Sequence, residues 1–179
     1  LDNEATRNLC ETAELLHSSS RLQHEEMRSL KSWFADLLGF SSNNAEWLKD
    51  CDRQAHTLLS DPQEQLVLHG DLHHGNVLDF GARGWRAIDP KGLYGERAAD
   101  FAALFLNPDL ADSQRPYAIS PQRFEQRIRL VSSHTGVEPV RLLRWIHAWS
   151  GLSAVWFIED GIAPETQRAV AHLASEALG

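Results

Sequence analysis

The sequence predicts an α+β domain that is predominantly helical and carries a small β-hairpin insert. Apolar residues recur at helical spacing before residue 60 and after residue 96, whereas strand-like runs are confined to residues 65–89. Strands and helices do not alternate along the chain, which argues against a doubly wound sheet. A chain of 179 residues can bury one independent core. We therefore expect a single domain over residues 1–179.

Residues 1–60 are expected to be helical. Apolar residues recur every three or four positions over residues 4–17, 26–39 and 45–59. Asn3 is a candidate N-cap for the first of these helices. Asp61-Pro62 ends the third helix, because the residue before a proline is disfavoured in the α region.

The hydrophobic period changes in residues 65–95. Residues 65–68 form an apolar run that is typical of a buried strand. Residues 77–80 and 85–88 form two further runs around Gly81-Ala82-Arg83-Gly84, a pattern that predicts a β-hairpin.

The expected pairing of this hairpin brings two polar residues together. If Phe80 faces Trp85, then Val77 faces Ile88 and Asn76 falls opposite Asp89. Directly paired residues have Cβ atoms about 4.5–5.5 Å apart. We therefore expect the side chains of Asn76 and Asp89 to point toward one place.

Residues 96–179 are expected to form a helical subdomain. Helical segments are predicted near residues 96–106, 121–134, 139–160 and 164–178. The third of them ends with the acidic pair Glu159-Asp160. This pair is either an ordinary charged surface or a contact for a cationic substrate.

Composition narrows the classes of partner and compartment. The formal net charge of −8 disfavours nucleic acid or an anionic membrane as the main partner. No apolar run approaches the ~18 residues that a membrane span needs, and no secretory signal is visible. Cys10 and Cys51 stand far apart without a CxxC motif, which favours free thiols in a reducing, cytoplasmic setting.

Chemistry is concentrated in His69-Gly70-Asp71-Leu72-His73-His74-Gly75-Asn76, directly after the first predicted strand. A dense polar cluster on a loop that leaves a strand is typical of a functional site. Asp71 is placed to accept a proton from an attacking hydroxyl. The oxygens of Asn76 and Asp89 suit a hard cation such as Mg²⁺. A base and two such ligands in this order predict phosphoryl transfer.

The same eight residues resemble the HxDxxxxN catalytic loop of the protein-kinase-like fold, in the form found in aminoglycoside phosphotransferases. The continuation over residues 85–93, with Gly95-Glu96 and Asp100-Phe101-Ala102, is similar to the streptomycin 6-phosphotransferase and hydroxyurea kinase branch of that family. The resemblance is strong over residues 66–106. It implies the carboxy-terminal lobe of such a kinase.

The resemblance implies a role for each matching position. Asp71 matches the catalytic base, and Asn76 and Asp89 match the two magnesium ligands. His73 stands where protein kinases place a catalytic-loop lysine, so it is expected to touch the transferred phosphoryl group.

Other positions are expected to support this centre. His69 matches a histidine that packs and orients the metal-binding segment. Asp100 matches a buried carboxylate that braces the catalytic loop through its backbone. Lys91 is expected either to contact phosphate, as a nucleotide-binding residue, or to be a solvated loop lysine. Glu159-Asp160 is retained as a candidate acceptor-binding pair.

The resemblance further implies ATP and Mg²⁺ as cofactors and a small molecule with a hydroxyl group as acceptor. An aminoglycoside such as streptomycin, or hydroxyurea, is expected as that acceptor, with antibiotic resistance as the outcome. The family's amino-terminal nucleotide-binding lobe has a glycine-rich turn, but residues 1–60 contain a single glycine, Gly39. We expect that lobe to be absent, and the 179 residues alone to bind ATP poorly and turn over little. The sequence does not indicate an oligomeric state.

Two alternatives remain open from the sequence. His69, Asp71, His73 and His74 are also a ligand set for a metal-dependent hydrolase. That hypothesis leaves Asn76 and Asp89 without a role. The other alternative is a binding remnant that has kept the lobe and lost catalysis.

Overall fold

The computed structural model describes residues 2–19, 27–40, 46–111, 114 and 116–179. The α-helices of these residues are α1 (Asp2–Ser19), α2 (Leu30–Trp33), α3 (Ala35–Leu38), α4 (Glu46–Ser60), α5 (Pro121–Thr135), α6 (Pro139–Glu159) and α7 (Glu165–Leu178). The strands are β1 (Arg28–Ser29), β2 (Gln65–Leu68), β3 (Val77–Asp79), β4 (Trp85–Ala87) and β5 (Leu93–Glu96). Four 3₁₀ turns complete the set: η1 (His74–Asn76), η2 (Gly81–Arg83), η3 (Arg97–Phe101) and η4 (Ala103–Leu106). The architecture is mostly helical with small sheets, as predicted.

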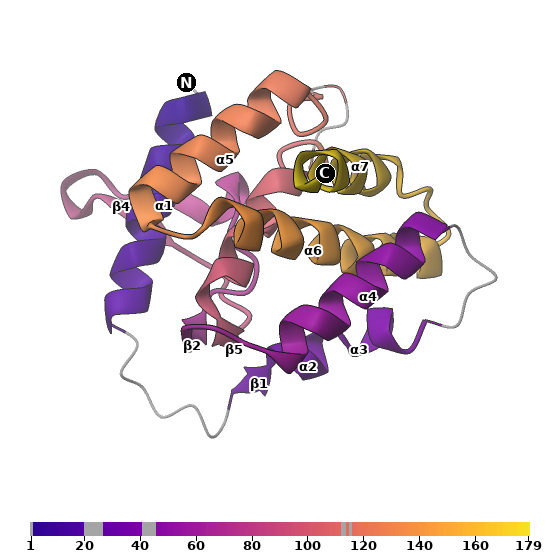
Figure 1. Cartoon of the computed structure of the whole chain (residues 1–179). Helices are drawn as coiled ribbons and strands as arrows, with labels where there is room; N and C mark the ends of the chain where they lie inside the picture. The colour runs from indigo at the N-terminus through magenta and orange to yellow at the C-terminus, as the bar shows by residue number, and fades with distance from the viewer. Residues whose placement is uncertain (1, 20–26, 41–45, 112–113, 115) are drawn as a thin grey trace.

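Helix α6 forms the centre of the molecule. It packs against α7, α4 and α5, while α1 lies beside α5 (Figure 1). Fourteen of its 21 residues are buried, among them Trp145 and Leu152. A helix that is apolar around most of its circumference has to be surrounded by other elements, which explains this arrangement.

A small sheet lies beside the helical core. Within the described residues its order is β1-β5-β2, with β5 antiparallel to β2 and parallel to β1. Gly95 in β5 is required by close packing, because a Cβ atom there would lie 2.4 Å from Leu30 Cδ1. Both β1 and β5 were outside the sequence-based prediction.

A buried ion pair fixes β5 to α6. The Arg141 guanidinium donates to both carboxylate oxygens of Glu96, at 2.7 and 2.6 Å, and Trp145 Nε1 donates to the same carboxylate at 2.8 Å. The hydrogen bond to Glu96 raises the pKa of Arg141 above its ordinary value. Breaking such a pair typically costs about 3–5 kcal/mol, so the sheet is firmly held to the helical body.

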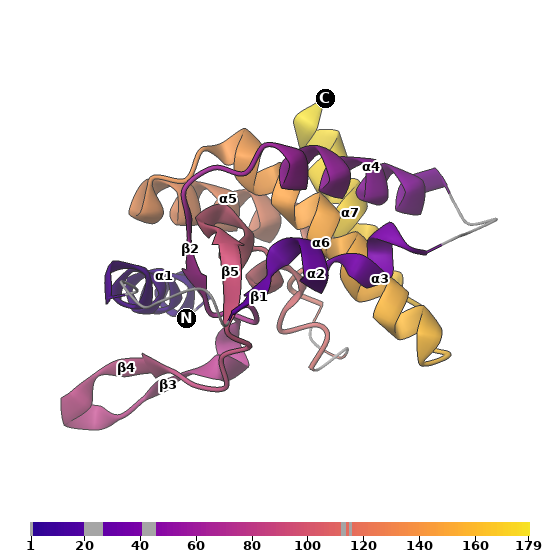
Figure 2. The same ribbon diagram turned by 90° about the horizontal axis from the view of Figure 1, so that it is seen from below.

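The predicted hairpin exists, but the predicted register is wrong by one residue. Strands β3 and β4 pair Val77 with Ala87 and Asp79 with Trp85. The connection therefore spans five residues, beginning with a turn in which Asp79 Oδ1 accepts from the Gly81 N–H at 2.8 Å. Asn76 consequently lies opposite Ile88, whose N–H donates to its carbonyl at 2.9 Å. The hairpin projects from the body beyond α1 (Figure 2).

Three other local predictions are also corrected. A single helix is expected over residues 26–39. Where the structure describes this segment, it consists of the short strand β1 followed by the two short helices α2 and α3. Phe34 ends α2, and its fully buried ring packs against the rings of α6. Residues 93–96 join the sheet, so the segment expected as a helix from 96 to 106 becomes two 3₁₀ turns. Asn3 is no cap, because α1 already includes Asp2.

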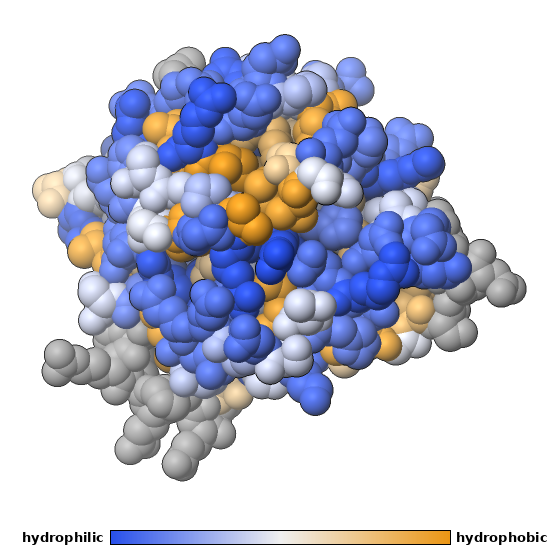
Figure 3. Space-filling model, viewed as in Figure 1, coloured by the Kyte–Doolittle hydropathy of each residue, from blue (hydrophilic) through white to orange (hydrophobic). Residues whose placement is uncertain are grey.

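The surface shown in Figure 3 is mostly hydrophilic, with hydrophobic residues gathered between α5 and α7. Cys10 and Cys51 are free, buried thiols. In the described part of the chain, we find no helix whose length and apolar content would allow it to cross a bilayer.

Candidate active site

The loop over residues 69–76, named here the catalytic loop after the motif that it resembles, is held to the body at its inner end, where β2 ends. The Asp100 carboxylate accepts from the N–H of His69 at 2.9 Å and from the N–H of Gly70 at 2.7 Å. Gly70 has φ +82°, and a Cβ there would lie 2.7 Å from Leu93 Cγ. A residue with a side chain would be strained at this turn, so glycine allows the chain to turn sharply toward Asp71.

The His69 side chain joins the loop to the exit of the hairpin. Its Nε2 lies 2.9 Å from the Ile88 carbonyl, and its Nδ1 accepts the Asp71 N–H at 3.3 Å. Because a carbonyl only accepts and an amide N–H only donates, these partners assign the ring proton to Nε2. One buried imidazole therefore contacts both Asp71 and the residue before Asp89.

Asp71 and Asn76 are in direct contact. Asn76 Nδ2 donates to the Asp71 carbonyl at 2.8 Å and to Asp71 Oδ2 at 3.3 Å. Since both partners are acceptors, the amide nitrogen faces Asp71 and Asn76 Oδ1 points away from it. Leu72 between them is fully buried and anchors the loop in the core.

Lys91 links the carboxylates of Asp71 and Asp89. Its Nζ lies 2.8 Å from Asp89 Oδ2 and 3.6 Å from Asp71 Oδ2. The hydrogen bond from Lys91 and its positive charge lower the pKa of Asp89, and the same hydrogen bond raises the pKa of Lys91. Asp89 has φ +56° and a side chain that is 69% exposed. Its carboxylate is therefore accessible from solvent despite the one-residue shift of the hairpin.

The two neighbouring histidines point in different directions. His73 Nδ1 accepts the Gly75 N–H at 3.1 Å, and His73 Nε2 lies 3.6 Å from Asp71 Oδ1. Burial lowers the pKa of His73. His74 lies against α1, with Nε2 4.0 Å from Asp2 Oδ1, and burial lowers its pKa to about 4.

The oxygen donors of this centre fit a magnesium ion. Asn76 Oδ1 and the exposed Asp89 carboxylate are hard oxygen donors of the kind that Mg²⁺ prefers. Asp71 contacts Asn76 directly and shares Lys91 with Asp89. The zinc hypothesis has less support. His69 uses both ring nitrogens within the protein, and His73 and His74 diverge. Among the described residues, no three His, Cys, Asp or Glu side chains are arranged to hold a metal.

Glu159 and Asp160 are not joined to this centre by any contact among the described residues. Glu159 is the last residue of α6 and Asp160 its C-cap, and both are exposed. They remain candidate acceptor contacts from the sequence.

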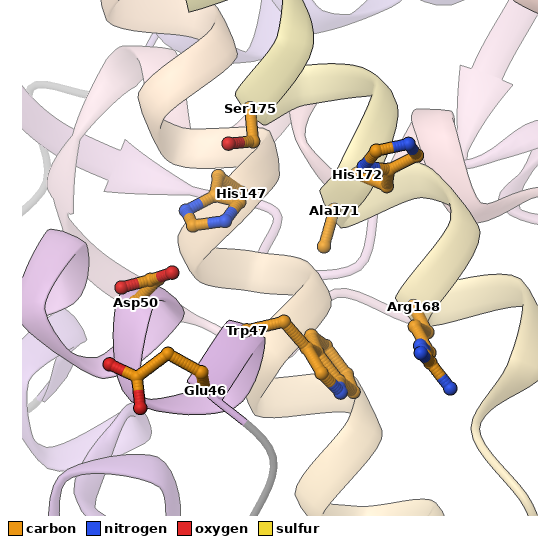
Figure 4. Close-up of a pocket in the computed structure, with 8 residues that line it drawn as sticks. All are labelled: Glu46, Trp47, Asp50, His147, Arg168, Ala171, His172 and Ser175. Carbon is orange, nitrogen blue, oxygen red and sulfur yellow. The ribbon is translucent and has the colours of Figure 1, made fainter.

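A pocket of about 520 Å³ lies elsewhere, between α4, α6 and α7 (Figure 4). Its lining includes Glu46 and Asp50 but none of the predicted site residues. Glu46 pairs with Lys49 and Asp50 with Arg53. Because this pocket contains none of the residues that the sequence motif marks, we place the candidate active site at the catalytic loop.

Two parts of the site were missed by sequence reasoning. His17 on α1 contacts Asp100, and Asp2 lies between His74 and the buried Arg127 of α5. These partners are up to 125 residues apart. No local sequence pattern marks such contacts. The one available signal was His17 itself, a histidine in the predicted first helix.

Comparisons with known proteins place the chain in a family. The family model for aminoglycoside/hydroxyurea antibiotic resistance kinases matches residues 1–161. The chain is 52% identical to a streptomycin 3''-kinase of Klebsiella pneumoniae over 160 residues, which cover 89% of this chain and 60% of that protein. It is 35% identical over 107 residues to a streptomycin 6-kinase of Streptomyces glaucescens, covering 59% of this chain and 34% of that one. It is 31% identical over 128 residues to a hydroxyurea phosphotransferase of Kitasatospora aureofaciens, covering 70% and 34%.

Proposed function

The chain belongs to the aminoglycoside/hydroxyurea antibiotic resistance kinase family, and on this premise we propose that it carries the catalytic centre of an ATP- and Mg²⁺-dependent phosphotransferase. The acceptor would be a hydroxyl group of a small molecule. The observation that carries the proposal is the connected series Asn76–Asp71–Lys91–Asp89, with successive contacts of 3.3, 3.6 and 2.8 Å.

In this proposal Asp71 accepts the proton of the attacking hydroxyl. Its hydrogen bond from Asn76 fixes the carboxylate, and its position beside Lys91 keeps it near the phosphate-binding ligands. General-base assistance of this kind typically contributes about 10²–10⁴ in rate. Asp71 is half-buried, so an acceptor hydroxyl can reach it from solvent.

Asn76 and Asp89 would hold Mg²⁺, which neutralises charge on the nucleotide phosphates when it is bound. Lys91 would then donate to a phosphate oxygen in place of its present carboxylate partners. His73 accepts the Gly75 N–H at Nδ1, so its Nε2 carries a proton and would donate a hydrogen bond to the transferred group. His69 and Asp100 would hold the loop in place.

We propose a streptomycin-like aminoglycoside as the first acceptor to test and hydroxyurea as the second. The 52% identity to a protein named for the 3'' position makes that hydroxyl the leading candidate. Because the chain spans 60% of that relative's length and 34% of the two others, further nucleotide contacts would come from a segment equivalent to the unmatched part. We propose that this segment is the amino-terminal nucleotide-binding lobe that the sequence resemblance implies.

The test compares the 179-residue chain with a chimera in which the amino-terminal part of the Klebsiella kinase precedes residue 1. ADP release is measured with ATP, Mg²⁺ and streptomycin or hydroxyurea. We expect turnover from the chimera and little from the chain alone. In the chimera, Asp71→Asn should lower kcat about 10²–10⁴-fold while nucleotide affinity stays near normal.

Asp89→Ala in the same chimera should instead weaken Mg²⁺-dependent nucleotide binding. Asp61→Asn, which changes an exposed carboxylate at the end of α4, is the matched control and should leave both quantities unchanged. Full activity in Asp71→Asn would refute the proposal. Identical defects in Asp71→Asn and Asp89→Ala would refute the division of roles.

A further inference from the structure

His17 lies in the last turn of α1 and reaches a carboxylate 83 residues away. Its Nε2 is 2.9 Å from Asp100 Oδ2, and the two side chains are 3% and 0% exposed. The imidazole also meets the Phe101 ring edge-on, with ring centroids 5.7 Å apart. The ring is therefore fixed in position, and it is inaccessible to substrate.

Asp100 uses the same oxygen, Oδ2, for two donors. One is His17 Nε2 and the other is the N–H of His69, while Oδ1 accepts from Gly70. The hydrogen bonds from the two backbone amides hold the carboxylate from the loop side, and His17 holds it from the side of α1. Without His17, the Asp100 carboxylate would be bonded only to the N–H groups of His69 and Gly70. The carboxylate and these two amides could then move together.

This carboxylate is costly to bury without full hydrogen bonding. Asp100 is 1% exposed, so donors from the protein have to replace water. His17 supplies a side-chain donor from an element outside the loop. It thereby connects α1, which packs beside α5 (Figure 1), with the segment that carries Asp71.

The segment held in this way leads directly to the reacting groups. Gly70 is followed by Asp71, whose N–H is bonded to His69 and whose carbonyl is bonded to Asn76. A shift of the peptide between residues 69 and 70 would therefore move Asp71 and Asn76 together. Misplacement of catalytic groups by ~1 Å can cost 10²-fold in rate.

We propose that His17 is a positioning residue for the catalytic loop and acts through Asp100. The proposal rests on the proposed function for the role of the loop. The contact itself can be tested without any enzymatic activity. Its consequence is that α1, far from the reacting groups in sequence, sets their geometry.

The test measures hydrogen exchange of backbone amides in the 179-residue chain. His17→Leu removes the donor at similar volume, and His17→Gln restores an N–H donor. We expect the amides of His69 and Gly70 to exchange ~10-fold faster or more in His17→Leu and to return toward the original rate in His17→Gln. His172→Leu, at an exposed histidine of α7, is the matched control and should change neither amide.

Turnover of the chimera gives the second measurement. We expect kcat to fall about tenfold in His17→Leu, with KM for the acceptor nearly unchanged, and to recover in His17→Gln. Unchanged exchange at His69 and Gly70 in His17→Leu would overturn the proposal. Equal acceleration at all core amides, without rescue by His17→Gln, would also overturn it, since that indicates a general packing role. A chimera without activity would refute the proposed function, while the exchange data would still decide the role of His17.

Discussion

Two aspartate carboxylates lie beside opposite ends of the catalytic loop, and the protein uses them in opposite ways. At the inner end, Asp100 is 1% exposed and accepts from three donors. At the outer end, Asp89 has a side chain that is 69% exposed and a single described partner, Lys91. A buried carboxylate that accepts from three protein donors builds structure, whereas an exposed one with free lone pairs can bind a ligand.

The histidines of the loop follow the same division. His69 uses both ring nitrogens to connect Asp71 with Ile88. Both ring nitrogens of His74 are buried without a hydrogen-bond partner among the described residues, near Asp2 and Arg127. The imidazole of His69 is therefore fully paired, and that of His74 is not.

Asp100→Ala should have the largest effect on stability. It leaves two buried amides and His17 without their acceptor, so we expect a loss of about 3–5 kcal/mol in the free energy of unfolding. Asp89→Ala should shift the urea midpoint only slightly, because that side chain is exposed. Urea unfolding followed by circular dichroism measures both. Equal shifts in the two variants would break the contrast between the two ends of the loop.

The pH dependence of stability should report on His74. Its pKa is about 4 in the folded chain, and the ordinary value for an unfolded histidine is 6.5. Between these values the unfolded chain binds one proton more, so stability is complete above pH 6.5 and declines as pH falls toward 4. The loss should amount to roughly 3 kcal/mol.

The measurement is urea unfolding at several pH values in the original chain and in His74→Leu. The variant should lose much of the decline between pH 6.5 and 4 if His74 causes it. The same slope in both chains would show that the unpaired imidazole near Asp2 does not cause the decline.

Lys91→Met should have the smallest effect. The free energy of unfolding should barely change, because partly exposed ion pairs contribute little. The pKa of Asp89 should rise back toward its ordinary value, since Lys91 is what lowers it. NMR titration of the aspartate carboxyl carbons measures this shift, and Lys49→Met on α4 serves as the control. An unchanged Asp89 titration would mean that the two groups are not paired in solution.

Local sequence patterns were sufficient for most of the fold. β2 lies at residues 65–68 as predicted, and the hairpin strands lie within one residue of their predicted ends. The predicted hairpin register was wrong because the turn begins one residue earlier than expected, at Asp79, whose carboxylate accepts from the Gly81 N–H. β5 was missed because its four residues include Gly95 and are held in a strand by pairing with β2, which is distant in sequence.

The candidate site was predictable where its residues are consecutive. The loop from His69 to Asn76 could be found from its density of polar groups, and the resemblance supplied Asp89 and Asp100. The supports from α1 could not be found in this way. His17 reaches Asp100 across 83 residues, and Asp2 lies beside His74 while pairing with Arg127 across 125 residues. The packing of α1 against the core brings both residues into place.

The single imidazole of His69 gives the projecting hairpin a mechanical connection to the proposed base. Its ring contacts the amide of Asp71 on one side and the carbonyl of Ile88 on the other. A displacement at the root of the hairpin would therefore be transmitted through this one ring to the backbone of Asp71.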